Sequence, residues 1–522
     1  MWCGIFISSV CFLCLAVSSS DQRSTPEDDS YVGAVVEFEV SADVTQNLAR
    51  YVQLIAQAAD QNADIIVFPE MTLTRGDRRV DVPIYGLLKQ ESIPALQPTS
   101  YDEIMVTISA AARQHQIYVL INVQEVMDCT SIAEDSEEYC PEKKEYLFNT
   151  NVIFDRTGAV IDRYRKINLF GEFTRTPALR PDLGLFSTDF GVTFGHYICF
   201  DLMFQVPSIQ VVEKNKITDV LFSTMWFSEL PYLTAVQIQE AYAYAQNVNF
   251  LGAGANNVRV GSAGSGIYSG KAGALASVMP GLPTTRLLVS RVPKVPGNVT
   301  GMTFPGPIYD PPTDHDSLVL ITDPSLPDHT SRLLVSGFQE FTLVDKDVSC
   351  TFRVRLTPRA GDGSKYQYKA LAFDGERSFS GLGEGDTRIC SVLACTGDTI
   401  DTCGKRFPTY VENSTSIFEE LIIVATVPTP ALDNLLDAHD SSFFPISLDV
   451  SIMPLEPSEY TYTEVQGDVT TVFTYTLVNT EKELYSFAVW GRVFEPAPGS
   501  SMVPFLSKSL LVIVLARTCP FV

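Results

Sequence analysis

Residues 32–40 of the chain read Val-Gly-Ala-Val-Val-Glu-Phe-Glu-Val, and residues 65–70 read Ile-Ile-Val-Phe-Pro-Glu. Both are short apolar runs of the kind that forms buried strands in an α/β sheet. Between them, apolar residues recur at helical spacing from Val44 to Ala59, and Asp43 or Ser41 stands where it can cap that helix. The stretch predicts a strand, a helix and a second strand, the repeating unit of an α/β fold.

The same alternation continues to about residue 253. It predicts helices over 101–115 and 234–247, and strands over 117–126, 194–199, 220–223 and 249–253. One hairpin interrupts the pattern, because the predicted strands 147–154 and 159–164 flank the turn-forming stretch Arg-Thr-Gly at 156–158. We therefore expect an α/β domain over residues 30–305.

The chain changes character after about residue 300. Four prolines between residues 305 and 312 form a linker-like stretch. Beyond it come short β-like runs without helical periodicity, such as 331–335, 352–356 and 471–477. A chain of 522 residues also exceeds the size that one hydrophobic core usually supports. We expect a second, β-rich domain over residues 315–495.

Both ends of the chain resemble targeting signals. Residues 1–20 form a short apolar run that ends in three serines, as a signal peptide does. Residues 500–522 combine small residues, a spacer and an apolar run, which resembles the signal for a glycolipid anchor; a secreted tail is the alternative. Sequons at Asn298 and Asn413 fit a glycosylated chain. These features predict a protein that is secreted or held at the extracellular face of the plasma membrane, with such an anchor as its only membrane contact.

The net charge of −25 argues against one class of partner. A surface this acidic repels phosphate backbones and anionic lipid, so we expect no nucleic acid partner. The sequence predicts no particular oligomeric state.

The cysteines indicate disulfides and one free thiol. Of the 11 cysteines, seven remain if both predicted targeting ends are removed, and an odd thiol in an oxidising compartment needs a reason. Cys129 and Cys140 flank an acidic loop that a disulfide between them would close. The four cysteines from Cys350 to Cys403 allow three pairings, and Cys199 is left unpaired.

Three reactive residues each follow a predicted strand: Glu70, Lys166 and Cys199. Sites in open α/β sheets form at the carboxyl ends of the strands, so we expect these side chains to converge. Together they suit amide hydrolysis. A Cys199 thiolate attacks the carbonyl, Glu70 takes the thiol proton and returns it to the amine, and the Lys166 ammonium stabilises the oxyanion.

Three further residues are candidates for the same site. The backbone N–H of Phe200 is expected to add a second oxyanion donor, and Glu172 to orient the lysine or the substrate. Trp226 follows another predicted strand and either lines the acyl pocket or packs as an ordinary core aromatic.

Three stretches together resemble the nitrilase superfamily, whose catalytic triad occurs in the order Glu, Lys, Cys. They read Phe-Pro-Glu at 68–70, Asp-Arg-Tyr-Arg-Lys-Ile-Asn-Leu-Phe at 162–170 and Tyr-Ile-Cys-Phe-Asp at 197–201. The stretches Asn-Thr-Asn-Val-Ile-Phe-Asp at 149–155 and Val-Asn-Phe-Leu-Gly-Ala at 248–253 are similar to the biotinidase and vanin (pantetheinase) branch.

This resemblance implies an αββα sandwich catalytic domain followed by a smaller β-rich base domain. It also implies a hydrolase of linear amides, other than peptide bonds, that works through a thioester without a metal or cofactor. The chain departs from the branch after Glu70, where Met-Thr-Leu replaces Asp-Gly-Ile, and at 74–77, where Thr-Arg-Gly-Asp replaces aromatic residues. The substrate is therefore not fixed by the resemblance.

Several readings of the function stay open. A pantetheinase splits pantetheine into pantothenate and cysteamine, whereas a biotinidase releases biotin from biocytin. A catalytically inactive surface binding protein on the same fold is the third reading, although all three triad residue types are present in order. A papain-type Cys–His pair is disfavoured, because His196 lies three residues before Cys199 on the same predicted strand and points to the opposite face.

Overall fold

The computed structural model describes residues 23–74, 76, 78–83, 92–130, 140–180, 182–360 and 365–494. The predicted signal peptide (residues 1–20) and the predicted anchor signal (residues 500–522) lie outside the described residues, as do Arg75 and Asp77 after the Glu70 motif. Where the structure describes the chain, none of its helices combines the length and hydropathy needed to cross a bilayer.

Two layers of strands form the N-terminal half, and they meet at β1, which pairs with β2 and, further along, with β10. One layer contains β1 (Ser30–Glu39), β2 (Ile65–Val67), β3 (Tyr118–Asp128), β4 (Glu145–Phe154), β5 (Val160–Arg165) and β13 (Arg286–Pro293). The other contains β6 (Gly184–Ser187), β7 (Thr193–Ile198), β8 (Asp219–Thr224), β10 (Asn249–Asn256), β11 (Ser265–Ser269), β12 (Ala274–Val278) and β14 (Gly306–Ile308).

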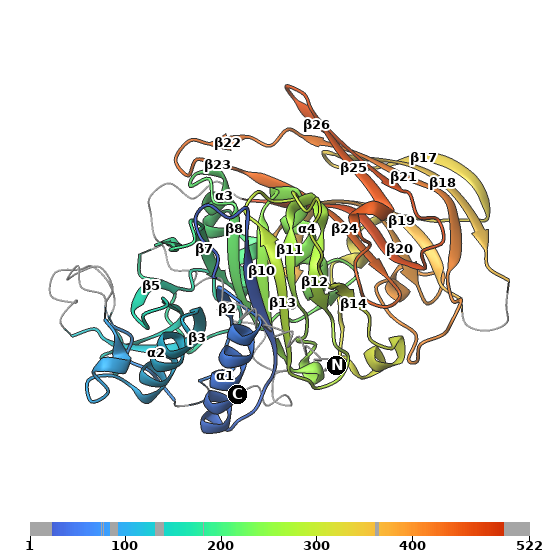
Figure 1. Cartoon of the computed structure of the whole chain (residues 1–522). Helices are drawn as coiled ribbons and strands as arrows, with labels where there is room; N and C mark the ends of the chain where they lie inside the picture. Colours follow the sequence, from blue (N-terminus) through green and yellow to red (C-terminus); the bar gives the residue numbers. More distant parts are fainter. Residues whose placement is uncertain are drawn as a thin grey trace, which may run out of the picture.

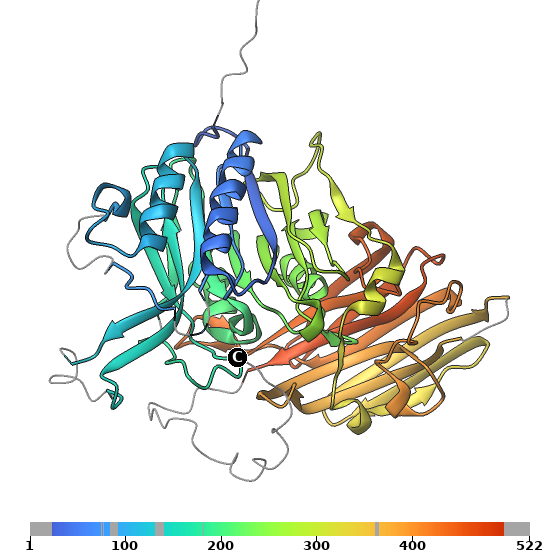
Figure 2. The same cartoon turned by 90° about the horizontal axis from the view of Figure 1, so that it is seen from below.

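Helices cover the outer faces of these layers. Helices α1 (Val44–Asp60) and α2 (Glu103–His115) lie side by side against the first layer (Figures 1 and 2), while the short α3 (Gln210–Glu213) and α4 (Ala235–Gln246) accompany the second. The side chain of Asp43 accepts a hydrogen bond from Gln46 N at 3.0 Å, so Asp43 rather than Ser41 caps α1.

The alternation of side chains along β1 explains the layering. Val35 packs with Leu221 and Leu251 of the second layer, whereas its neighbour Val36 packs with Tyr51 and Ile108 of the helices. Each layer thus buries one face against the other layer and one against helices. The predicted αββα sandwich is confirmed, including the hairpin of β4 and β5.

The C-terminal half is a pair of antiparallel sheets, as its β-like runs predict. The first contains β16 (Thr330–Leu333), β19 (Gln367–Phe379), β20 (Gly383–Cys395), β27 (Leu484–Val493) and β24 (Ser441–Asp449). The second contains β17 (Gly337–Asp345), β18 (Val348–Pro358), β21 (Ser416–Pro428), β26 (Thr470–Leu477) and β25 (Tyr460–Gln466). Two-stranded pairs join β9 (Glu229–Leu230) to β15 (Ile321–Thr322) and β22 (Leu432–Asp433) to β23 (Ala438–His439).

One disulfide closes a loop in the N-terminal half, and two others cross-link the C-terminal half. The predicted Cys129–Cys140 bridge is present, and of the three possible pairings downstream the structure has Cys350–Cys390 and Cys395–Cys403. The Cys350–Cys390 bridge joins β18 to β20 and therefore links the two sheets. Cys199 is the free cysteine of the described residues.

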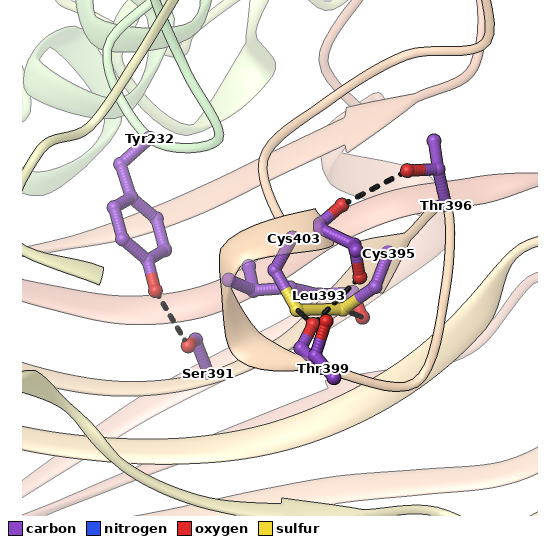
Figure 3. The surroundings of a disulfide bond; sticks show 8 residues. Tyr232, Ser391, Leu393, Cys395, Thr396, Thr399 and Cys403 are labelled. Carbon is purple, nitrogen blue, oxygen red and sulfur yellow. Dashed lines mark hydrogen bonds between the residues drawn. A yellow bond between two sulfur atoms is a disulfide. The ribbon is translucent and has the colours of Figure 1, made fainter. Parts of the chain in front are cut away.

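Side chains from both halves form one hydrophobic cluster, so the C-terminal sheets pack directly against the N-terminal half. Tyr242 of α4 stacks 6.3 Å from Phe444 of β24, which packs beside α4 in Figure 1. Tyr232 reaches across to Ser391 of β20 with a 2.8 Å hydrogen bond, close to the Cys395–Cys403 bridge (Figure 3). This packing brings the first C-terminal sheet against the second layer of the sandwich.

Candidate active site

Glu70, Lys166 and Cys199 line one cleft of about 960 Å³. Lys166 directly follows β5 and Cys199 directly follows β7, while Glu70 comes three residues after β2. All three side chains belong to nearly buried residues, with exposed fractions of 3% for Glu70, 1% for Lys166 and 5% for Cys199. The structure therefore brings together the three side chains that the strand ends predict to converge.

The Lys166 ammonium lies between two carboxylates. Its Nζ donates to Glu70 Oε1 at 2.9 Å and also to Glu172 Oε1. Burial by itself lowers the pKa of Lys166, but the charges of Glu172 and Glu70 outweigh burial and hold that pKa well above its usual value. Lys166 is consequently a fixed positive charge in the cleft.

The Glu70 carboxylate is held by donors on both of its oxygens. Oε1 also accepts from Asn149 Nδ2 at 2.7 Å, and Oε2 accepts from the backbone N–H of Met225 at 2.8 Å. Burial pushes the pKa of Glu70 upward, but the Lys166 charge and these hydrogen bonds outweigh it, so the pKa lies below its usual value. Glu70 is therefore ionised and able to accept a proton.

The backbone at Cys199 is left-handed, with a φ of +49°. A non-glycine residue in this region costs about 1–3 kcal/mol unless its surroundings fix it. Here the Asp201 carboxylate, two residues on, accepts from Ile198 N at 3.2 Å, Tyr164 Oη at 2.7 Å and Asn168 N at 2.8 Å. These bonds pin the sharp turn from β7 into the 3-10 helix Cys199–Met203 and fix where the thiol points.

The thiol itself faces the Glu70 side of the cleft. Cys199 Sγ lies 3.8 Å from the carbonyl oxygen of Met225, the residue whose N–H binds Glu70. Burial first, and the Glu70 charge second, raise the pKa of the Cys199 thiol, against the opposing effect of Lys166. These effects favour the protonated thiol over the thiolate in the free protein.

The other predicted site residues take different places. Glu172 joins the Lys166 cluster, and the Phe200 ring packs 4.7 Å from Phe170. Trp226 lines a second, smaller pocket beside Cys199 and also packs in the hydrophobic core, and its contact with an acyl group stays a prediction. His196 bonds to Asp162 at 2.8 Å and does not line the cleft, as expected for the opposite face of its strand.

Two protein families match separate parts of the chain. The carbon-nitrogen hydrolase family matches residues 32–277, and the vanin C-terminal domain matches residues 318–497. Vanin-like protein 1 of Drosophila melanogaster is 34% identical over 500 residues, which covers 91% of this chain and 88% of that protein. The chain belongs to the vanin family of carbon–nitrogen hydrolases.

Membership in the vanin family makes the chain a hydrolase of carbon–nitrogen bonds in amides other than peptides. Human biotinidase is 28% identical over 419 residues, covering 72% of this chain and 73% of that protein. Mouse pantetheinase is 26% identical over 493 residues, covering 91% and 89%. At these identities the vanin-family relatives do not separate one amide substrate from the other.

The structure adds residues to the vanin-family site that strand ends alone do not predict. Asn149 donates from one amide nitrogen to Glu70 and, at 2.9 Å, to Glu172. Asn122 donates to Asn149 Oδ1 at 2.8 Å, which turns the amide nitrogen toward both carboxylates. Arg175 flanks Glu172 at 3.6 Å. A cue for Asn149 was its place in a stretch that resembles the vanin branch.

Over the described part of the chain, no group of three or more His, Cys, Asp or Glu side chains is arranged to hold a metal ion. The charged residues of the cleft instead pair with one another, as Lys166 does with Glu70 and Glu172.

Proposed function

We propose that the chain cleaves a linear amide through a thioester on Cys199, with Glu70 as general base and Lys166 as the cationic third member. The observation that carries this proposal is the shared cleft, where a free thiol, an ionised carboxylate and a fixed ammonium line one cavity. A purely structural role explains this buried ion pair poorly, because burying two charges costs free energy that burying apolar side chains in their place would not cost.

The order of the proton transfers follows from the lowered pKa of Glu70 and the raised pKa of the Cys199 thiol. As Cys199 Sγ bonds to the amide carbon, Glu70 accepts the thiol proton, and the Lys166 ammonium with the Phe200 backbone N–H stabilises the oxyanion. Glu70 then passes that proton to the nitrogen as the carbon–nitrogen bond breaks and the amine leaves. A water molecule, deprotonated by Glu70, attacks the thioester, and Cys199 recovers its proton as the carboxylic acid leaves. Glu172 and Asn149 hold Lys166 and Glu70 in position throughout.

For the substrate we propose pantetheine, which yields pantothenate and cysteamine. Mouse pantetheinase aligns with 91% of this chain and human biotinidase with 72%, while the identities, 26% and 28%, do not distinguish the two. The open cleft of about 960 Å³ has room for a long polar acyl group such as pantothenoyl.

Hydrolysis of pantetheine and of biocytin by wild type and by Cys199→Ala tests this proposal. We expect cysteamine release by wild type, little biotin release, and a Cys199→Ala variant that folds but has lost nearly all turnover. Preferred release of biotin would make the chain a biotinidase. If wild type turns over neither substrate and iodoacetamide does not modify Cys199, the chain is an inactive binding protein. Glu464→Gln, at an exposed position of β25 that does not line the cleft, is the control with unchanged turnover.

We further propose that residues 30–305 form the catalytic domain and that residues 315–495 form a β-rich domain that supports it. We also propose that the chain is secreted or held at the outer cell surface. Three disulfides suit an oxidising compartment, and the predicted glycosylation sites Asn298 and Asn413 are exposed. Loss of mass on enzymatic deglycosylation tests glycosylation at these sites. Release of the protein from cells by a phosphatidylinositol-specific phospholipase tests whether a glycolipid anchor holds it at the surface.

A further inference from the structure

A second, small pocket of about 30 Å³ opens beside the nucleophile. Cys199, Phe170 and Phe227 line both this pocket and the main cleft, so the two cavities are neighbours at the nucleophile. Its volume suffices for about two methylene-sized groups. The remaining walls are mostly apolar: Phe200, Met203, Trp226, Leu233, Phe379 and the edge of Glu229.

One wall of this pocket comes from the C-terminal half of the chain. Phe379 ends β19, and its ring meets the edge of Phe200, the residue after the nucleophile, at a centroid distance of 5.4 Å. Gly383, where β20 begins, approaches so closely that a Cβ there would lie 2.9 Å from the Phe200 ring. The turn between β19 and β20, residues 379–383, therefore packs against the segment that carries Cys199 and Phe200.

A buried ion pair fastens this turn to the catalytic half. Arg377 of β19 pairs with Glu229, which also accepts a hydrogen bond from Ser380 of the turn. The Arg377 guanidinium lies 3.1 Å from Asp323 on its other side and 4.6 Å over the Phe379 ring. Breaking a buried pair by removing one partner is costly, so the pair fixes the turn in one position. The hydrogen bond from Tyr232 to Ser391 holds β20 further along (Figure 3).

The two cavities divide the substrate at the scissile bond. Glu70, which has to protonate the leaving amine, lines the main cleft and does not line the small pocket. The amine therefore leaves on the cleft side. The acyl carbon stays on Cys199, which faces both cavities, so the first carbons of the acyl chain are the atoms next to the small pocket.

We infer that Phe379 is a specificity-determining residue that limits the acyl chain to unbranched carbon next to the scissile carbonyl. This inference rests on the proposed function and assigns part of the substrate pocket to the C-terminal half. With Phe379 in place, two methylenes fit and a branch does not; beyond them the chain turns into the open cleft.

Two chromogenic amides with the same amine test the inference. One is the p-nitroanilide of pantothenic acid, and the other carries an added methyl group on the carbon next to the carbonyl. One methyl group in a tight pocket changes kcat/KM by about 10–200-fold. We expect wild type to prefer the unbranched amide by at least about tenfold, and Phe379→Ala to lose most of that preference, with Phe379→Leu between them. The ratio of the two kcat/KM values does not depend on how much of each variant is folded.

Phe473→Ala is the matched control. Phe473 is the same residue type in the same half, is 2% exposed against 3% for Phe379, and does not line the pocket. It should keep the wild-type ratio even if its melting temperature falls. A wild-type ratio in both Phe379 variants would overturn the inference and leave the proposed hydrolase standing. Absence of turnover by wild type on both amides and on pantetheine would instead overturn the proposed function and this inference with it.

Discussion

The Nζ of Lys166 lies 2.9 Å from Oε1 of Glu70, and both side chains are almost fully buried. The ammonium holds the pKa of the carboxyl below its usual value, although burial alone would raise it. Burial first, and the Glu70 charge second, raise the pKa of the Cys199 thiol, while the Lys166 charge opposes them. The site thus holds an ionised base beside a thiol that keeps its proton.

Replacing Glu70 by Gln tests the base. The amide keeps the size of the side chain and an oxygen for the Met225 N–H, but it does not accept the thiol proton at neutral pH. Since a positioned general base contributes about 10²–10⁴-fold, kcat for pantetheine should fall by that factor. Steady-state kinetics checks this, with Glu464→Gln, an exposed change outside the cleft, as a control of near wild-type rate. A Glu70→Gln variant with a tenth or more of wild-type kcat would show that another group is the base.

Asn149→Ala should lower kcat by about tenfold with little change in KM. Asn149 donates to both Glu70 and Glu172, so its loss frees two carboxylates that flank Lys166, without touching the sulfur. Asn151→Ala is the matched control, because Asn151 is a buried asparagine on the same strand that binds Asn122 and neither carboxylate. Equal losses in both variants would mean that Asn149 acts only through the fold of β4.

The sequence alone predicts some residues of this site and not others. Glu70, Lys166 and Cys199 could be predicted because each follows a predicted strand, and parallel strand ends gather at one edge of a sheet. Asn149 lies inside β4 opposite Gln124 of β3, and Asn122, which donates to it, faces Asn151 two positions on. No periodicity in the sequence encodes that register.

Other features depend on how distant segments dock. Phe379 follows Cys199 by 180 positions and reaches it only because the C-terminal sheets pack on the catalytic half. The Cys350–Cys390 pairing likewise depends on β18 and β20 facing each other across two sheets, whereas Cys129 and Cys140 close a short loop that the sequence alone suggests.

Glu240 should make the stability of the protein fall as pH rises. It lies on α4 with 4% exposure, and burial first and the charges of Glu456 and Glu459 second raise the pKa of its carboxyl from 4.5 to about 8. Between these two values the native state binds more protons than the unfolded state, so the free energy of unfolding decreases with pH, by up to about 1.4 kcal/mol per pH unit from this group.

Urea denaturation of Glu240→Gln at pH 5 and pH 8 measures this contribution. The variant should be more stable than wild type at pH 8, with a smaller difference at pH 5. Glu456→Gln, a change at an exposed neighbour, should alter the pH dependence much less. An identical pH dependence in Glu240→Gln and wild type would refute the assignment.

The two C-terminal disulfides should contribute unequally to stability. Cys350 and Cys390 are 40 positions apart and Cys395 and Cys403 are 8 apart, so chain entropy predicts losses of about 4 and about 2.5 kcal/mol when each bridge is removed. Denaturation midpoints of the two double alanine variants give the order. A larger loss from removing Cys395–Cys403 would show that native-state packing, rather than unfolded-chain entropy, sets these contributions.

Mass spectrometry of the enzyme quenched in acid during turnover of pantetheine tests the Cys199 thioester most directly. A fraction of the wild-type protein should gain the mass of one pantothenoyl group, peptide mapping should locate that group on Cys199, and the Cys199→Ala variant should neither gain it nor release cysteamine. An acyl group found on a different residue, or cysteamine release that persists in Cys199→Ala, would contradict the assignment of the nucleophile.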